Sequence, residues 1–184
     1  MRILGVDPGS RTTGYGVIAA DGPKISFVAC GTIRTGRETD FSRRLLTIFQ
    51  DLCGVISQYA PDVAAVEDMY VDRNPRSALK LGQARGAAVV AARHSNLIVY
   101  DYPARLVKQS VAGYGRADKA QVQHMVRVLL GLDAAPSTDA ADALAVAICH
   151  AHRASIPGRS PGEQPASPAF HRLSSFNRIV TGQQ

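Results

Sequence analysis

The feature that most constrains the fold of this chain is a change in the spacing of its apolar residues near residue 40. Before that point, three short apolar runs at residues 2–6, 14–20 and 25–33 are separated by an Asp-Pro-Gly-Ser turn signal at 7–10 and an Asp-Gly-Pro signal at 21–23. Short apolar runs bounded by such residues are typical of strands joined by tight turns. We therefore expect the chain to begin with three strands in an antiparallel meander.

After residue 40 the apolar residues recur at three- and four-residue steps, which indicates an amphipathic helix from Phe41 to Tyr59 that Pro61 ends. Helices and strands then alternate, and the elements we expect are a strand at 63–66, a helix at 77–93 that starts at Ser77, a strand at 97–100, and helices at 103–111, 117–130 and 137–152. Early strands followed by crossover helices predict an α/β fold with a five-stranded mixed sheet flanked by helices. This is the order of a ribonuclease H-like domain.

The composition divides the chain into two parts and indicates a class of partner. Residues 1–153 have ordinary globular composition, whereas residues 154–184 begin with a proline-, serine- and glycine-containing stretch that is typical of a flexible tail. The net charge of +6 favours a polyanionic partner, nucleic acid above all. The sequence has no signal peptide pattern and no apolar run of the roughly 18 residues that a membrane span needs, so we expect a cytoplasmic protein.

Four acidic residues stand at unusual places in this pattern. Asp7 ends the first expected strand and Glu67 ends the fourth, while Asp139 and Asp142 lie three residues apart on one face of the last helix. Ligands of open α/β sheets gather outside the carboxyl ends of strands, so these acids would converge if strands one and four are neighbours. Alone, three of them have ordinary interpretations: a turn residue, a solvated strand end and a first-turn acid favoured by the helix dipole. Asp142 is harder to explain in this way, because alanine and leucine surround it.

A cluster of four carboxylates predicts a particular chemistry. Such groups repel one another strongly unless a cation neutralises them, and hard divalent ions prefer oxygen ligands. Two Mg²⁺ ions about 4 Å apart, with Mn²⁺ as a substitute, can clamp the displacement of an oxygen from a phosphodiester. We therefore interpret Asp7, Glu67, Asp139 and Asp142 as both catalytic residues and metal ligands of a phosphodiesterase.

Ordered blocks of sequence add a family resemblance to this interpretation. They occupy residues 5–11, 13–16, 77–86, 107–109, 121–126 and 139–145. Together they resemble the RuvC family of crossover (Holliday) junction endodeoxyribonucleases over roughly residues 2–153. The resemblance implies that the four acids are catalytic in a Mg²⁺-dependent homodimer, which nicks opposed strands of a four-way junction symmetrically and leaves 5′-phosphate and 3′-hydroxyl ends for recombination and repair. It also implies a partnership with the branch-migration complex of RuvA and RuvB.

The same resemblance indicates residues that contact DNA. Lys108 and Lys119 match family positions near the DNA and the active site, where ammonium groups hold phosphates or offset transition-state charge. Tyr70 stands where the family usually has phenylalanine, and its ring keeps the ability to stack on a base. Arg76 and Lys80 share a helix face, and DNA contact and a solvated surface remain equally open for both. Further candidates for a DNA groove are Arg11, Arg85, Arg105 and Arg116.

Several alternatives remain open at this stage. A nucleotide-binding protein of the actin and sugar-kinase class also has an acid and a glycine after its first strand, but it needs a second lobe. A non-catalytic junction-binding module would lack some of the acids, and a ribonuclease acting on RNA–DNA hybrids would share them. Gly82 and Gly86 permit close helix packing, either in a dimer seam or against the sheet.

Overall fold

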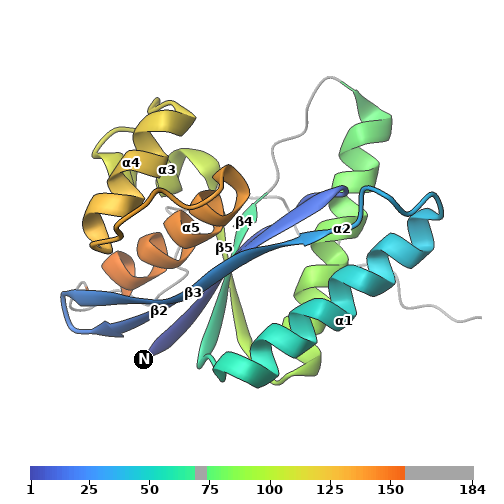
Figure 1. Ribbon diagram of the computed structural model, residues 1–184, viewed down its shortest axis with the longest axis horizontal. Coiled ribbons are helices and arrows are strands. Elements are labelled where there is room, and N and C mark those ends of the chain that lie inside the picture. The colour runs from blue at the N-terminus through green and yellow to red at the C-terminus, as the bar shows by residue number, and fades with distance from the viewer. Residues whose placement is uncertain (69–73, 156–184) are drawn as a thin grey trace, which may run out of the picture.

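Strands and helices follow one another along the chain in the order that the apolar spacing predicts (Figure 1). The computed structural model describes residues 1–68 and 74–155. Its elements are β1 Arg2–Asp7, β2 Thr12–Asp21, β3 Lys24–Arg34, α1 Phe41–Tyr59, β4 Val63–Asp68, α2 Pro75–His94, β5 Ile98–Pro103, α3 Ala104–Ala112, α4 Lys119–Leu129 and α5 Thr138–Ala154. Tyr70, and the predicted tail from residue 156 onward, lie outside the described residues.

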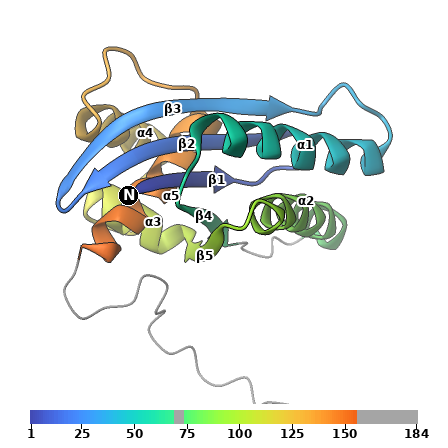
Figure 2. The ribbon, with the colours of Figure 1, turned by 90° about the horizontal axis from the view of Figure 1, so that it is seen from below.

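The strands form one mixed sheet in the order β3-β2-β1-β4-β5 (Figure 2). The first three strands are antiparallel, while β4 runs parallel to β1 and β5 runs parallel to β4. The five-stranded mixed sheet and the ribonuclease H-like architecture are thereby confirmed. Because β1 and β4 are parallel neighbours, their carboxyl ends meet at one edge of the sheet.

Helices cover both faces of the sheet, as Figure 1 shows: α1 and α2 lie on one side, and α3, α4 and α5 lie on the other. Residues of β1 contribute to a hydrophobic core on each face of the sheet, because successive side chains of a strand point to opposite faces. Leu4 packs in the core beneath α1 and α2, and Ile3 packs in the core beneath α5. In the described part of the chain, none of the helices has the length and apolarity needed to cross a bilayer.

Glycines on β1 and β2 allow α5 to pack its backbone directly on the sheet. A Cβ atom added to Gly14 would lie 1.9 Å from the carbonyl oxygen of Asp139, and one added to Gly5 would lie 2.0 Å from that of Ala143. Only a residue without a side chain fits such an approach. The start of α5 is therefore held against the strand that pairs with β1.

Two helix starts differ from the predictions because side-chain caps determine them. The predicted start at Ser77 is wrong: α2 begins at Pro75, after Asn74, whose side chain accepts hydrogen bonds from backbone N–H groups of the first turn. Proline suits the first helical position, where its missing N–H would have no partner. Likewise α4 begins at Lys119 and not at residue 117, because Asp118 closes a capping box.

Candidate active site

The sheet brings Asp7 and Glu67 together at the carboxyl ends of two neighbouring strands. Asp7 is the last residue of β1, whereas Glu67 is the last but one of β4, which continues to Asp68 and was predicted to end at Glu67. Val6 pairs with Val66, so Asp7 and Glu67 follow side by side on the parallel strands. The Asp7 side chain hydrogen-bonds that of Glu67. Such a bond requires that one of the two carboxyl groups carries a proton, which shows how closely the two negative charges are juxtaposed.

Helix α5 brings a third acid to the same place. Asp142 is half-buried one turn into this helix, and it lines a cavity of about 250 Å³ together with Asp7 and Glu67. The complete lining combines three carboxylates, two lysines and apolar side chains: Asp7, Glu67, Ala104, Val107, Lys108, Lys119, Val122, Asp142 and Ala145. Oxygen ligands and cationic groups therefore face one hollow at the carboxyl edge of the sheet.

Asp139, the fourth predicted acid, does not line this cavity. It lies in the first turn of α5, and its charge raises the pKa of Asp7 and of Asp142. Among residues 1–68 and 74–155, no three His, Cys, Asp or Glu side chains are already arranged to hold a metal ion. The carboxylates thus form an open cluster that faces a common cavity, with Asp139 outside the lining.

Burial and mutual repulsion make this cluster hard to ionise. Burial, followed by the charges of Glu67, Asp142 and Asp139, raises the pKa of Asp7 to about 8. Burial is also the main cause that raises the pKa of Glu67 and the pKa of Asp142. Carboxylates that resist ionising together are stabilised by a cation between them, and an all-oxygen donor set fits Mg²⁺ or Mn²⁺. The residues present therefore suit a hard divalent ion.

Two lysines bring positive charge to the cavity from α3 and α4. The Lys119 Nζ lies 3.6 Å from Oδ2 of Asp142, although 73% of the lysine side chain is exposed. Lys108 is half-buried, and its charge lowers the pKa of Glu67 and of Asp142. Both lysines are placed to contact an anion that enters the cavity.

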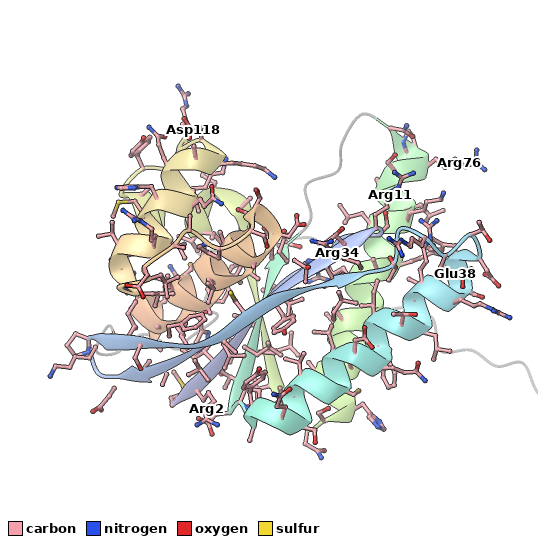
Figure 3. The ribbon with its side chains drawn as sticks, in the orientation of Figure 1. Arg2, Arg11, Arg34, Glu38, Arg76 and Asp118 are labelled. Atoms are coloured by element: carbon pink, nitrogen blue, oxygen red, sulfur yellow. The ribbon has the colours of Figure 1, made fainter. Side chains whose placement is uncertain are left out.

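Two other predicted DNA-binding residues, Arg76 and Lys80, are not part of the cavity lining. Arg76 and Lys80 are exposed in the first turns of α2, and Figure 3 shows Arg76 projecting from the start of that helix. The Lys80 Nζ lies 5.6 Å from the centre of the Phe41 ring, a cation–π contact that connects the starts of α2 and α1. Tyr70 is outside the described residues, so its stacking role stays a prediction.

The apolar walls of the cavity were missed by the sequence analysis. Val107 and Val122 are buried in these walls. Helical spacing could have indicated them, because Val107 precedes Lys108 and Val122 lies three residues, or one turn, after Lys119. These walls exclude water from one side of the carboxylates, which strengthens every charge interaction in the cavity.

Comparisons with known proteins identify the family of this chain. The family model for crossover junction endodeoxyribonuclease RuvC matches residues 3–150. A crossover junction endodeoxyribonuclease RuvC from Marinobacter nauticus is 57% identical over 150 residues, which cover 82% of this chain and 85% of the relative. The structure of Thermus thermophilus RuvC in complex with a Holliday junction substrate superposes with a TM-score of 0.80 at 36% identity, and the match covers 88% of this chain and 99% of that one. The chain therefore belongs to the RuvC family of crossover junction endodeoxyribonucleases.

Proposed function

We propose that Asp7, Glu67, Asp139 and Asp142 hold the divalent ions with which this crossover junction endodeoxyribonuclease cuts DNA. The observation that carries the proposal is the shared cavity, where three of these acids and two lysines meet at one edge of the sheet. The family's reaction uses a divalent ion, and an all-oxygen ligand set suits Mg²⁺, with Mn²⁺ as a substitute. We propose two Mg²⁺ per site, because two such ions would balance the charge of four carboxylates. Such ions supply Lewis acidity that activates water and neutralises charge on the leaving 3′-oxygen.

The protein's own side chains position the scissile phosphodiester. Lys119 is mostly exposed and is paired with Asp142, so its ammonium group can exchange this partner for a non-bridging phosphate oxygen. Lys108 is more enclosed, and its charge offsets the negative charge that develops on the phosphate. Asp7 must release its proton before it serves as a ligand, because protons and cations compete for the same oxygens.

The substrate that fits this assignment is a four-way DNA junction. The protein would cut two opposed strands of the junction symmetrically and leave 5′-phosphate and 3′-hydroxyl ends that a ligase can reseal. Cleavage of a synthetic mobile junction in Mg²⁺, mapped on both strands, tests this activity. Equal cutting of RNA–DNA hybrids would favour the ribonuclease alternative, and ATP hydrolysis without nuclease activity would favour the nucleotide-binding alternative.

A carboxylate variant tests the roles of the acids. We expect Asp7→Asn to lower the cleavage rate by about 10³-fold or more, because the amide is a poor ligand for a divalent ion, while junction binding persists. Asp51→Asn is the matched control, because Asp51 is exposed on α1 and distant in sequence from every predicted acid. Cleavage by Asp7→Asn at the rate of the control would show that the metal site is assigned wrongly.

We also propose that two copies of the chain pair through α2, since paired nicks need two active sites. Leu79 and Val90 are 66% and 57% exposed, and they share a stripe of α2 with Gly86 because the three residues are spaced by seven and four. A Cβ atom at Gly86 would meet no other atom within 4 Å, so this glycine does not pack against the sheet. An exposed apolar stripe with a small residue at its centre suits a helix from a second copy. By family membership alone, we also propose RuvA and RuvB as partners.

A further inference from the structure

A second hollow lies at the carboxyl edge of β1, on the side of the meander. It has a volume of about 510 Å³ and is lined by Arg11, Thr12, Arg34, Gly36 and Arg37. We call it the arginine pocket. Figure 3 shows Arg11 and Arg34 at the end of the β2–β3 hairpin that is remote from its turn. The lining holds three guanidinium groups and no acidic residue, which gives the pocket a strong positive potential.

The backbone beneath these arginines is fixed by a buried threonine. Thr35 is only 4% exposed, and its hydroxyl lies 3.1 Å from the carbonyl oxygen of Ser10 and 3.3 Å from that of Arg11. Its backbone N–H also donates to the Arg11 carbonyl, at 2.9 Å. Because Arg34, the last residue of β3, pairs with Thr12, the first residue of β2, Arg34 lies beside Arg11, which directly precedes β2. The pocket is therefore preorganised at its base.

The three guanidinium groups are available to an anion. In residues 1–68 and 74–155, no ion pair or side-chain hydrogen bond is formed by the guanidinium groups of Arg11, Arg34 or Arg37. The acids that follow in the chain are engaged elsewhere: Glu38 accepts a hydrogen bond from the backbone of Asp40, and Asp40 caps α1. Gathered like charges without an acidic partner repel one another, so an anionic ligand would stabilise them.

The register of the sheet relates this pocket to the carboxylates. Asp7 of β1 pairs with Gly14 of β2, and Thr12, two residues away on β2, pairs with Arg34 of β3. With about 3.4 Å of rise per residue and about 4.8 Å between strands, the backbones of Asp7 and Arg34 are roughly 12 Å apart. This separation corresponds to a few nucleotide steps along a DNA strand, so one strand can reach both places.

We infer that the arginine pocket binds a backbone phosphate of the junction that lies a few nucleotides from the scissile one. The planar guanidinium fork matches the oxygens of a phosphate, and such contacts fix register without reading sequence. The pocket would hold the strand so that the scissile phosphate faces the carboxylates. This inference rests on the proposed function and assigns to these three arginines a positioning role in it.

Binding titrations with charge-matched variants test the pocket. The probe is a synthetic four-way junction in EDTA, so that binding is measured without cleavage. For Arg34→Gln and for Arg37→Gln we expect a Kd about 5- to 10-fold higher than wild type, and a slope of log affinity against log salt that is smaller by about one per arginine removed. Lys24→Gln is the control, because it removes one exposed charge from the turn end of the same hairpin. Equal Kd and equal slope for Arg34→Gln and Lys24→Gln would overturn the inference.

A neutral-linkage scan identifies the phosphate. Junctions that carry one methylphosphonate at successive positions are titrated with wild type and with Arg34→Gln. We expect one position outside the cleaved step at which the neutral linkage weakens junction binding by wild type but leaves the affinity of Arg34→Gln unchanged. If every neutral linkage costs both proteins the same affinity, no phosphate contacts Arg34 and the inference fails. Neither titration depends on cleavage, so a fault in the carboxylate assignment would appear only in the cutting assay of Asp7→Asn.

The threonine beneath the pocket provides a further test. Thr35→Val removes the hydroxyl contacts to the carbonyl oxygens of Ser10 and Arg11 and leaves the backbone hydrogen bond to Arg11, whereas Thr35→Ser keeps the hydroxyl. We expect Thr35→Val to weaken junction binding by about 3-fold or more and Thr35→Ser to restore binding close to wild type. Equal binding by the two variants would show that the pocket needs no preorganised base and would contradict the positioning role.

Discussion

At the scale of single residues, the Asp7 carboxyl is strongly affected by burial and by neighbouring negative charges. Its pKa of about 8, compared with 3.8 for a free side chain, means that between these pH values the folded protein keeps a proton that the unfolded chain has lost. Stability then falls as pH rises through this interval and becomes level above it. In EDTA, we expect the free energy of unfolding to include such a decline between about pH 4 and pH 8, and we expect Mg²⁺ to remove most of it.

A comparison with Asp7→Asn measures this effect together with the interaction of Asp7 with Glu67, because groups outside the cluster titrate in the same way in both proteins. In urea titrations without metal, we expect the variant to be more stable than wild type by about 1–3 kcal/mol at pH 8 and to have no such advantage at pH 4. Asp51→Asn should follow wild type at every pH. Parallel pH profiles for wild type and Asp7→Asn would show that the folded protein does not raise the pKa of this carboxyl.

His150 gives a second prediction at this scale, with the opposite dependence on pH. It is buried on α5, its Nδ1 lies 2.8 Å from the Tyr102 hydroxyl, and burial lowers its pKa to about 4 from 6.5. Its contribution to stability is present above pH 6.5 and is lost as pH falls towards 4. We expect Tyr102→Phe to cost about 1–2 kcal/mol in urea unfolding at pH 7, because the buried Nδ1 loses its partner.

The exposed Tyr114 supplies the control for this pair. Tyr114→Phe removes the same hydroxyl from the loop after α3, where water solvates it, and should leave stability within about 0.5 kcal/mol of wild type. An equally small loss for Tyr102→Phe would mean that its hydrogen bond to His150 adds nothing to the fold.

At the scale of elements, the apolar spacing was sufficient to predict the type and order of the strands and helices. It could not predict the start of α2, because Asn74 contributes a polar cap and not an apolar residue to the pattern. Nor could it predict that α5 packs directly on Gly14, since a glycine has no side chain and does not contribute to the spacing of apolar residues. The sequence predicted that four acids converge; three of them line one cavity, and Asp139 in the first turn of α5 is not part of that lining.

The glycine contact leads to a prediction about how α5 is positioned. In Gly14→Ala, the new methyl group would overlap the carbonyl oxygen of Asp139 and push the start of α5 away from the sheet. Displacement of catalytic groups by about 1 Å is enough to cost about 100-fold in rate, and we expect a loss of that size in junction cleavage. Circular dichroism and thermal unfolding should show a folded protein with a lowered Tm.

Gly54→Ala is the matched substitution. Gly54 is exposed on α1, where an added Cβ meets no other atom within 4 Å, so the change should stabilise the helix by about 0.5–1 kcal/mol and leave cleavage unaltered. If Gly14→Ala cuts junctions as fast as Gly54→Ala, close packing of α5 is not what positions the acids.

At the scale of the whole molecule, the helices on the two faces of the sheet contribute to different functional surfaces. The face with α3, α4 and α5 builds the cavity, whereas α1 and α2 cover the other face and leave the outer stripe of α2 exposed (Figure 1). The arginine pocket and the carboxylates share one edge of the sheet, and neither Leu79 nor Val90 of the exposed α2 stripe is among the residues that line the two hollows. Substitutions in the α2 stripe would then disrupt the dimer without changing the residues of the active site.

The paired variant Leu79→Glu with Val90→Glu tests this separation. Two acidic groups on the exposed stripe of α2 would be placed against their own copies in a symmetric dimer, where like charges repel. We expect sedimentation equilibrium to show a monomer, and we expect a supercoiled plasmid that carries a cruciform to be nicked once and not linearised. Val128→Glu, which changes a similarly exposed valine on α4, should leave both readouts as in wild type. A paired variant that still sediments as a dimer would show that the second copy binds to another surface.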